Sequence, residues 1–438
     1  MGAESAVKVA GKEPGDKLVL LLIAGSGMLA QFLSLVAGII VARMVGVEGR
    51  GQVVMVGVLA QMASQLTLGG SLPNAISKEL ATHGLRARDG LRGLVGRWVL
   101  WGCLAATAAG IAMLLNEGPG ITPEVVALAI GTGLMALNGM TARILVSSML
   151  GEGADGLAIA LTGLLPQLAA ALVLGGALAL GVDWGPVEIV AVMLFAQSLV
   201  LAFRFRALAP SRGRDVQPLD RSELARLARR THIGSVGPLD GLSLDRALVG
   251  ALVGSVGLGL YSAAVALGSL ATMLGGIVAM VALPRIAAAQ AAGGTEERSV
   301  VRRWLVLAAI LMVGSAAVFM AANPFAIPIL FGEEFRGAIA CGYWCVAASA
   351  FLAFRRVLIA VLQGRGRGGF ASWAELALTP FVVLAALLGN LFDDVEYVGM
   401  GMLGVGIASC VILGVAVRRL TPAPALARAA APTGDATG

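Results

Sequence analysis

Charged side chains interrupt several long apolar stretches of this sequence, and arginine is the commonest of them. Arg143 and Arg356 each lie in such a stretch, and Arg246 lies in a third, THIGSVGPLDGLSLDRALVGAL. An arginine keeps its proton when partly dehydrated, and its planar guanidinium can donate two parallel hydrogen bonds to a phosphate. We therefore interpret Arg143, Arg246 and Arg356 as candidate ligands for a phosphate-bearing substrate.

Carboxylates accompany these arginines. Asp240 and Asp245 lie in the same apolar stretch as Arg246, and Glu375 lies in another. A charge deep in a membrane is costly unless it faces a cavity or an opposite charge. We therefore expect Asp240 and Asp245 to balance Arg246, and all three carboxylates are candidate sites for a coupling H+ or Na+. A buried structural ion pair is the alternative interpretation.

The arginines also have structural alternatives. Arg143 and Arg356 lie eight residues before Gly151 and Gly364, respectively, where their apolar stretches end. That spacing puts them about 11 Å below the membrane surface, within reach of the headgroups if their side chains snorkel. Arg43, in the glycine-rich segment VARMVGVEGRG, is a further candidate substrate ligand, with a role in a tight turn as the alternative.

The sequence offers little for catalysis or for metal binding. It has two histidines and four cysteines, and all four cysteines lie in apolar stretches. Cys341 and Cys345 would share one face of a helix, but a zinc site needs further ligands and none lies nearby. We expect no enzyme activity, no metal and no cofactor.

The composition is that of an all-α integral membrane protein. Hydrophobic residues make up 58% of the 438 residues and charged residues 13%, and the mean hydropathy is +0.88. Soluble domains carry roughly 25% charged residues, so this chain cannot cover a water-facing surface. Its apolar stretches have the length of membrane-spanning helices and are too long for barrel strands.

Twelve apolar stretches are long enough to cross a membrane. Their approximate ranges are 18–45, 52–80, 97–115, 122–150, 156–181, 186–208, 231–254, 258–283, 304–323, 337–363, 370–390 and 398–418. Of the Lys and Arg residues, 24 fall in connections on the side of the termini and three on the other side. The positive-inside rule then predicts a multi-pass protein of the cell membrane with both termini cytoplasmic. The same distribution argues against nucleic-acid binding.

The predicted spans form two groups of six, at 18–208 and 231–420. The basic segment 209–230 joins them and is either a helix on the membrane surface or a solvated linker. The segment 1–17 is expected to be cytoplasmic, and 421–438 to be a disordered cytoplasmic tail.

The two groups carry an internal repeat. Segment 42–53 matches 250–261 at an offset of 208 residues, and 143–158 matches 356–371 at an offset of 213. Because an even number of spans separates the copies, they would have the same orientation in the membrane, as in parallel-repeat transporters. The repeat also places Arg143 over Arg356. We therefore expect the binding site between two similar bundles.

Five segments together resemble a known family. They are VARMVGVEGRGQ, GGSLPNAISKELA, LDRALVGALVGSVGLGLYSAA, PILFGEEFRGA and VLQGRGRGGF. Across about residues 18 to 420 the chain resembles bacterial lipid-linked oligosaccharide flippases of the polysaccharide biosynthesis family. That family belongs to the multidrug/oligosaccharidyl-lipid/polysaccharide exporter superfamily, which also holds the multidrug and toxic compound extrusion (MATE) transporters.

The resemblance implies a V-shaped, MATE-like bundle with a cationic lumen. It implies that undecaprenyl-pyrophosphate-linked oligosaccharide passes from the cytoplasmic to the outer leaflet by alternating access, for cell-surface polysaccharide biosynthesis. The implied partners are this polyprenyl pyrophosphate carrier, membrane lipids and other polysaccharide-assembly proteins. Rival interpretations are a cation-coupled drug antiporter of the same fold, a peptidoglycan-precursor flippase, and a membrane-embedded sugar polymerase or ligase.

Overall fold

A computed structural model describes residues 14–69, 71–116, 121–208, 224, 226–228, 232, 236–292 and 296–420. Every regular element in these ranges is a helix, which confirms the all-α prediction. Most of the predicted segments 1–17, 209–230 and 421–438 lies outside the described residues. Ten described stretches are long and apolar enough to cross a membrane, so the chain is a multi-pass integral membrane protein.

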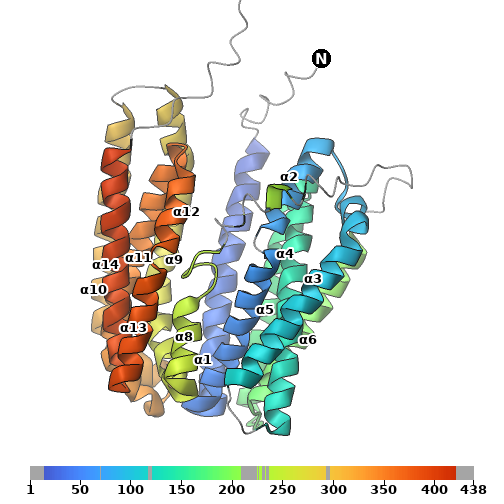
Figure 1. Cartoon of the computed structure of the whole chain (residues 1–438), viewed down its shortest axis with the longest axis vertical. Coiled ribbons are helices and arrows are strands. Elements are labelled where there is room, and N and C mark those ends of the chain that lie inside the picture. The colour runs from blue at the N-terminus through green and yellow to red at the C-terminus, as the bar shows by residue number, and fades with distance from the viewer. Residues whose placement is uncertain are drawn as a thin grey trace, which may run out of the picture.

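The helices pack as two groups that lie side by side in Figure 1. The first group comprises α1 (Pro14–Ser64), η2 (Gln65–Gly69), α2 (Leu72–His83), α3 (Ala87–Asn116), α4 (Pro123–Glu152), α5 (Gly156–Ala179) and α6 (Pro186–Ala207). The second comprises α8 (Leu244–Leu252), α9 (Gly254–Ala292), α10 (Glu296–Phe331), η3 (Glu333–Gly337), α11 (Ala338–Gly364), α12 (Gly368–Leu376), α13 (Thr379–Phe392) and α14 (Val395–Arg419). The ribbons approach each other at the lower end of the view, near α8, and diverge toward the end that carries the N-terminus.

The sequence explains where such a long helix as α4 begins and ends. Thr122 precedes it in an extended conformation, and its hydroxyl accepts a hydrogen bond from Val125 N at 3.3 Å. Pro123 follows at the first helical position, where its missing N–H costs nothing. Gly153 ends the helix with a φ of 72°, a left-handed conformation that glycine adopts without strain.

The difference between ten stretches and twelve predicted spans arises at two places. Residues Gly25–Thr67 count as one stretch, but Gly46 inside it is not helical, with φ 67° and ψ −166°. The Arg50 guanidinium donates to the Gly38 carbonyl, twelve residues earlier, so the chain folds back on itself at Gly46. This agrees with the turn predicted for VARMVGVEGRG.

The second place is the predicted helix at 231–254, where a continuous span is wrong for the described residues. Helix α8 has only nine residues, and a turn at 238–242 precedes it. Pro238 lacks an N–H for the helical hydrogen-bond ladder, and the glycines around it favour non-helical conformations.

Helices α1 and α9 cross in close contact and join the two groups. A Cβ atom at Gly51 would overlap the Ser255 carbonyl oxygen, and one at Gly259 would overlap the Val47 carbonyl oxygen. Gly51 and Gly259 are 208 residues apart, and so are Val47 and Ser255. The contact is therefore reciprocal, as a two-fold axis between copies at that offset would make it.

Two arginines of α1 bind the second group near this crossing. Arg50 is buried; its Nε donates to Ser262 Oγ at 2.8 Å, and its guanidinium lies 4.5 Å from the Phe331 ring centroid. Arg43 Nε donates to the Leu330 carbonyl oxygen at 2.9 Å, and Arg43 Nη2 donates to that of Ile329. Carbonyls at a helix C-terminus lack helical partners, so Arg43 caps α10 with a favourable charge.

We predict that Gly51→Ala destabilises the protein, because the new methyl group meets backbone that cannot rotate away. Overpacking of this kind costs about 1–3 kcal/mol, so the melting temperature in detergent should fall. Gly57→Ala, on the same helix with no atom within 4 Å of the new Cβ, is the matched control. It should leave the melting temperature unchanged or raise it; equal melting of both variants would contradict the close crossing.

Candidate functional site

The candidate site is built on the irregular segment before α8. Gly241 N and Leu242 N both donate to the Gly237 carbonyl oxygen, at 3.1 and 2.9 Å, and Leu244 N donates to that of Pro238 at 2.8 Å. These bonds form a compact turn that presents Asp240. Within a membrane, non-helical backbone is tolerated where it is covered by protein or lines a water-filled cavity.

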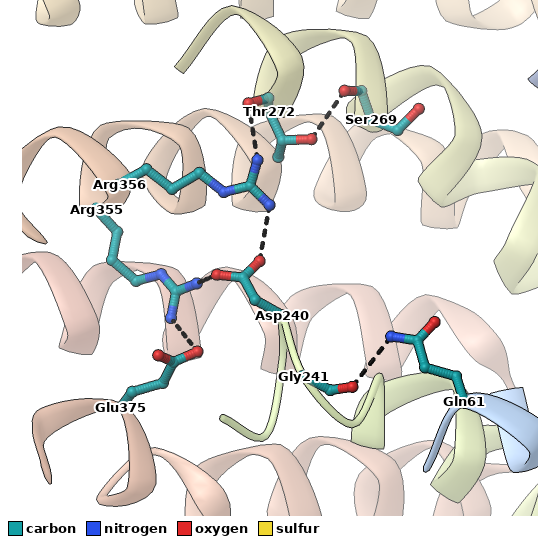
Figure 2. Close-up of polar contacts among 8 residues, drawn as sticks. All are labelled: Gln61, Asp240, Gly241, Ser269, Thr272, Arg355, Arg356 and Glu375. Carbon is teal, nitrogen blue, oxygen red and sulfur yellow. Dashed lines mark hydrogen bonds and ion pairs between the residues drawn. The ribbon is translucent and has the colours of Figure 1, made fainter. Parts of the chain in front are cut away.

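Two neighbouring arginines of α11 share the Asp240 carboxylate (Figure 2). Arg356 Nη2 donates to Oδ1 at 2.7 Å, and Arg355 Nη2 donates to Oδ2. Arg356 Nη1 also reaches the Thr272 carbonyl oxygen of α9 at 3.3 Å. The turn is thereby bound to both α9 and α11.

A second carboxylate, that of Glu375, forms an ion pair with Arg355. Arg355 Nη1 lies 3.3 Å from Glu375 Oε1, which projects from α12. The four side chains Asp240, Arg355, Arg356 and Glu375 therefore carry two positive and two negative formal charges. A balanced set of this kind lowers the cost of placing charge among apolar helices.

The exposed fractions divide the network into a buried and an open part. The Arg355 and Glu375 side chains are 1% and 14% exposed, whereas those of Arg356 and Asp240 are 34% and 43% exposed. Arg355 is therefore fixed by its surroundings. Arg356 and Asp240 are the members that an incoming ligand can reach.

The first helix group also contacts the turn. Gln61 of α1 donates through Nε2 to the Gly241 carbonyl oxygen at 3.0 Å. The residue next to Asp240 is thus held by one group while Asp240 itself is held by the other (Figure 2). A movement of either group would alter the position of the turn.

The structure brings together only some of the residues proposed from the sequence. Asp240, Arg356 and Glu375 meet, but the expected pairing of Asp240 with Arg246 is replaced by its pairing with Arg355 and Arg356. Asp245 instead accepts a hydrogen bond from the Tyr261 hydroxyl at 2.9 Å. Arg355 was not among the residues proposed from the sequence, although the doublet of adjacent arginines inside an apolar stretch was a visible signal.

Arg143 and Arg43 occupy other surroundings. Arg143 Nη1, on α4, is buried and has no hydrogen-bond partner in the described part of the chain. Its role, as a substrate ligand or as a snorkelling side chain, stays a prediction from the sequence. Arg43 lies in the cap of α10 and outside the Asp240 network.

Among the residues that the structure describes, no group of three or more His, Cys, Asp or Glu side chains is placed to hold a metal ion. The site can therefore bind a charged ligand through its arginines and carboxylates. Two guanidinium groups hold one carboxylate on a turn, and a phosphate offers the same paired oxygens to them.

Comparisons with known proteins agree with this description. A family model described as "Polysaccharide biosynthesis protein" matches residues 221–340, which include α8, α9, α10 and η3. No curated protein sequence matches the chain.

Solved structures with the same fold cover nearly the whole chain. An inward-facing multidrug resistance MATE family transporter of the MOP superfamily has a TM-score of 0.68 at 17% identity, covering 89% of this chain and 94% of its own. The outward-facing conformation of such a transporter gives a TM-score of 0.55 at 17% identity, covering 91% and 95%. A MOP superfamily transporter from Pyrococcus furiosus, whose reported binding pocket has reverse polarity, gives 0.57 at 17% identity, covering 91% and 93%.

The protein is therefore an integral membrane protein with the fold of the MATE transporters, and its residues 221–340 resemble the polysaccharide biosynthesis family.

Proposed function

We propose that this protein is a flippase that moves an oligosaccharide linked to polyprenyl pyrophosphate from the cytoplasmic to the outer leaflet. The observation that carries the proposal is the pair of guanidinium groups on α11 that share the Asp240 carboxylate. The irregular turn that bears Asp240 is contacted by both helix groups. We propose no enzymatic step, since moving an intact lipid-linked sugar breaks no bond.

The proposed topology has twelve crossings with both termini cytoplasmic. It counts the two arms of α1 on either side of Gly46 separately, and it counts the segment through α8 as one crossing. The end where α1 begins also carries the arginines that start α10 and end α14 (Figure 1). The positive-inside rule places such an end in the cytoplasm.

We propose that the substrate diphosphate replaces Asp240 on the two arginines. Arg356 is open enough to make the first contact, and Arg355 is held ready by Glu375. A diphosphate carries more charge than a carboxylate and can accept bonds from both guanidinium groups. Its arrival would release the turn, which Gln61 connects to the first helix group.

Alternating access would then follow from the movement of one group against the other. The greater similarity to the inward-facing than to the outward-facing MATE structure, with TM-scores of 0.68 and 0.55, supports an inward-open state. Arg143, with its unpartnered buried Nη1, and Arg246 are the proposed cationic contacts beyond the Asp240 network.

A cation-coupled drug antiporter is the second candidate, because the solved neighbours include multidrug transporters. Asp240, Asp245 and Glu375 would then be the coupling or drug-binding carboxylates. The two functions predict opposite ligand charges. Binding of inorganic pyrophosphate and of a lipophilic cation to the purified protein therefore distinguishes them.

Deletion of the gene should leave the lipid-linked oligosaccharide on the inner leaflet. We expect the full-length intermediate to accumulate and surface polysaccharide to be lost, because assembly would continue without translocation. Mass spectrometry of extracted lipid-linked sugars measures the accumulation. Unchanged intermediates together with increased drug sensitivity would support the antiporter instead.

Arg356→Ala should reduce flipping in proteoliposomes by roughly 10- to 100-fold, the effect of losing one charged hydrogen-bond donor to a phosphate. Arg143→Ala should also reduce it, without lowering membrane abundance. Arg356→Lys keeps the charge but loses the planar fork, so an intermediate rate is expected. The control Arg303→Ala removes an exposed arginine of α10 outside the site. Normal flipping by both Arg356→Ala and Arg143→Ala would exclude the proposed phosphate contacts.

Asp240→Asn should strengthen binding of inorganic pyrophosphate by roughly tenfold, because the anion no longer displaces a charged competitor. The same change should lower the melting temperature of the unliganded protein, since two arginines lose their shared counter-charge. Titration calorimetry and thermal denaturation measure the two effects. Weaker pyrophosphate binding by the folded variant would show that Asp240 does not compete with phosphate.

A further inference from the structure

A second basic site lies away from the Asp240 network, at the end of the second helix group where α10 begins and α14 ends. A cavity of about 460 Å³ opens there, within the size range of small-ligand sites. Four of its lining residues are arginines, contributed by three different helical segments: Arg298, Arg302, Arg365 and Arg418.

The lining of the cavity changes from basic to apolar along α10. Arg298 and Arg302 lie one helical turn apart, and Leu305, Val306 and Ala309 continue the same lining over the next two turns. At 1.5 Å per residue, the lining runs for roughly 16 Å from a basic end into the apolar zone. An amphiphile with an anionic head and a hydrocarbon chain has this same order of charge and apolarity.

Buried hydrogen bonds hold the wall of the cavity together. Arg365 is buried; its Nε donates to Glu297 Oε1 at 2.6 Å, and its Nη1 donates to the Val417 carbonyl oxygen. Glu297 is buried as well, so this pair ties the end of α11 to the start of α10 and to α14. The contacts of Arg365 therefore fix the shape of the cavity, and the exposed arginines are not needed for it.

The remaining arginines face outward. Arg298, Arg302 and Arg418 are exposed, and within the described ranges none of them forms an ion pair. With Glu297 offsetting Arg365, three positive charges are left among the described side chains that line the opening. Such a group attracts an anion with several oxygen acceptors, and guanidinium suits phosphate.

Topology alone does not account for this clustering. The first helix group also has a cavity at the same end of the molecule, of about 510 Å³, lined by Gly84, Arg86 and Glu152 among others. Among the described residues that line it, one is basic and one is acidic. The positive-inside rule would act on both groups alike, so the concentration of arginines in the second is a property of that cavity.

We propose that this cavity is a binding site for an anionic phospholipid of the cytoplasmic leaflet. The phosphate is bound by Arg298, Arg302 and Arg418, and one acyl chain lies along Leu305, Val306 and Ala309. The site is separate from the proposed flipping pathway. Its cytoplasmic placement follows from the proposed orientation, but its chemistry does not depend on which substrate is flipped.

The test compares two double variants of the full-length protein in nanodiscs that contain phosphatidylglycerol and phosphatidylcholine. Arg302→Gln/Arg418→Gln removes two cavity arginines. Arg303→Gln/Arg419→Gln removes the next residue in each helix, which is exposed and does not line the cavity. Native mass spectrometry then counts the lipids that remain bound to each variant.

We expect the cavity variant to lose about tenfold or more of its preference for phosphatidylglycerol over phosphatidylcholine, the effect of two charges at a phosphate. The control variant should keep that preference. Millimolar inorganic phosphate should not displace the lipid, because it lacks the acyl chain. Equal retention by both variants would overturn the proposal, and displacement by inorganic phosphate alone would assign the site to a free phosphate.

The readout is bound lipid, so loss of flipping does not enter it. If flipping fails in the Arg356 experiments while the lipid preference behaves as expected, the phospholipid site stands without the proposed function. Thermal denaturation of both double variants confirms that each is folded, and removal of exposed arginines is expected to leave the melting temperatures alike.

Discussion

Asp240 accepts hydrogen bonds from both Arg355 and Arg356, and the turn that carries it has no helical ladder to hold it in place. In apolar surroundings a charge without a counter-charge is strongly destabilising. The carboxylate therefore fixes the turn against α11, and the arginines stay folded inward because the carboxylate is there. The position of α8 and the contact of Gln61 with the turn depend on this shared interaction.

The sequence predicted the fold class because composition and apolar length are local properties of the chain. It also identified Asp240, Arg356 and Glu375, since a charge in an apolar stretch is visible without a structure. It could not assign their partners, because Asp240 lies 115 and 116 residues before the two arginines that bind it. Proximity in sequence favoured Arg246, whereas the fold brings a different helix to Asp240.

The partners of Arg50 could not be predicted for the same reason. Arg50 lies in the segment VARMVGVEGRG, for which the sequence suggests only a local turn. Its actual partners, Ser262 and Phe331, belong to the other helix group. Arg355 was not proposed as a site residue, because the repeat aligned only Arg356 with Arg143. An internal repeat identifies positions that both copies share. It cannot identify a functional residue that only one copy has.

The reciprocal crossing at Gly51 and Gly259 restricts how the two groups can move. It lies near the end where the ribbons converge, together with Arg50 and the Arg43 cap of α10. Opening at that end must break these contacts, and each charged hydrogen bond is worth about 1.5–3 kcal/mol. A ligand can shift such an equilibrium only through a difference in its affinity for the two states. The proposed exchange of Asp240 for a diphosphate would supply such a difference, because it acts on a turn that both groups hold.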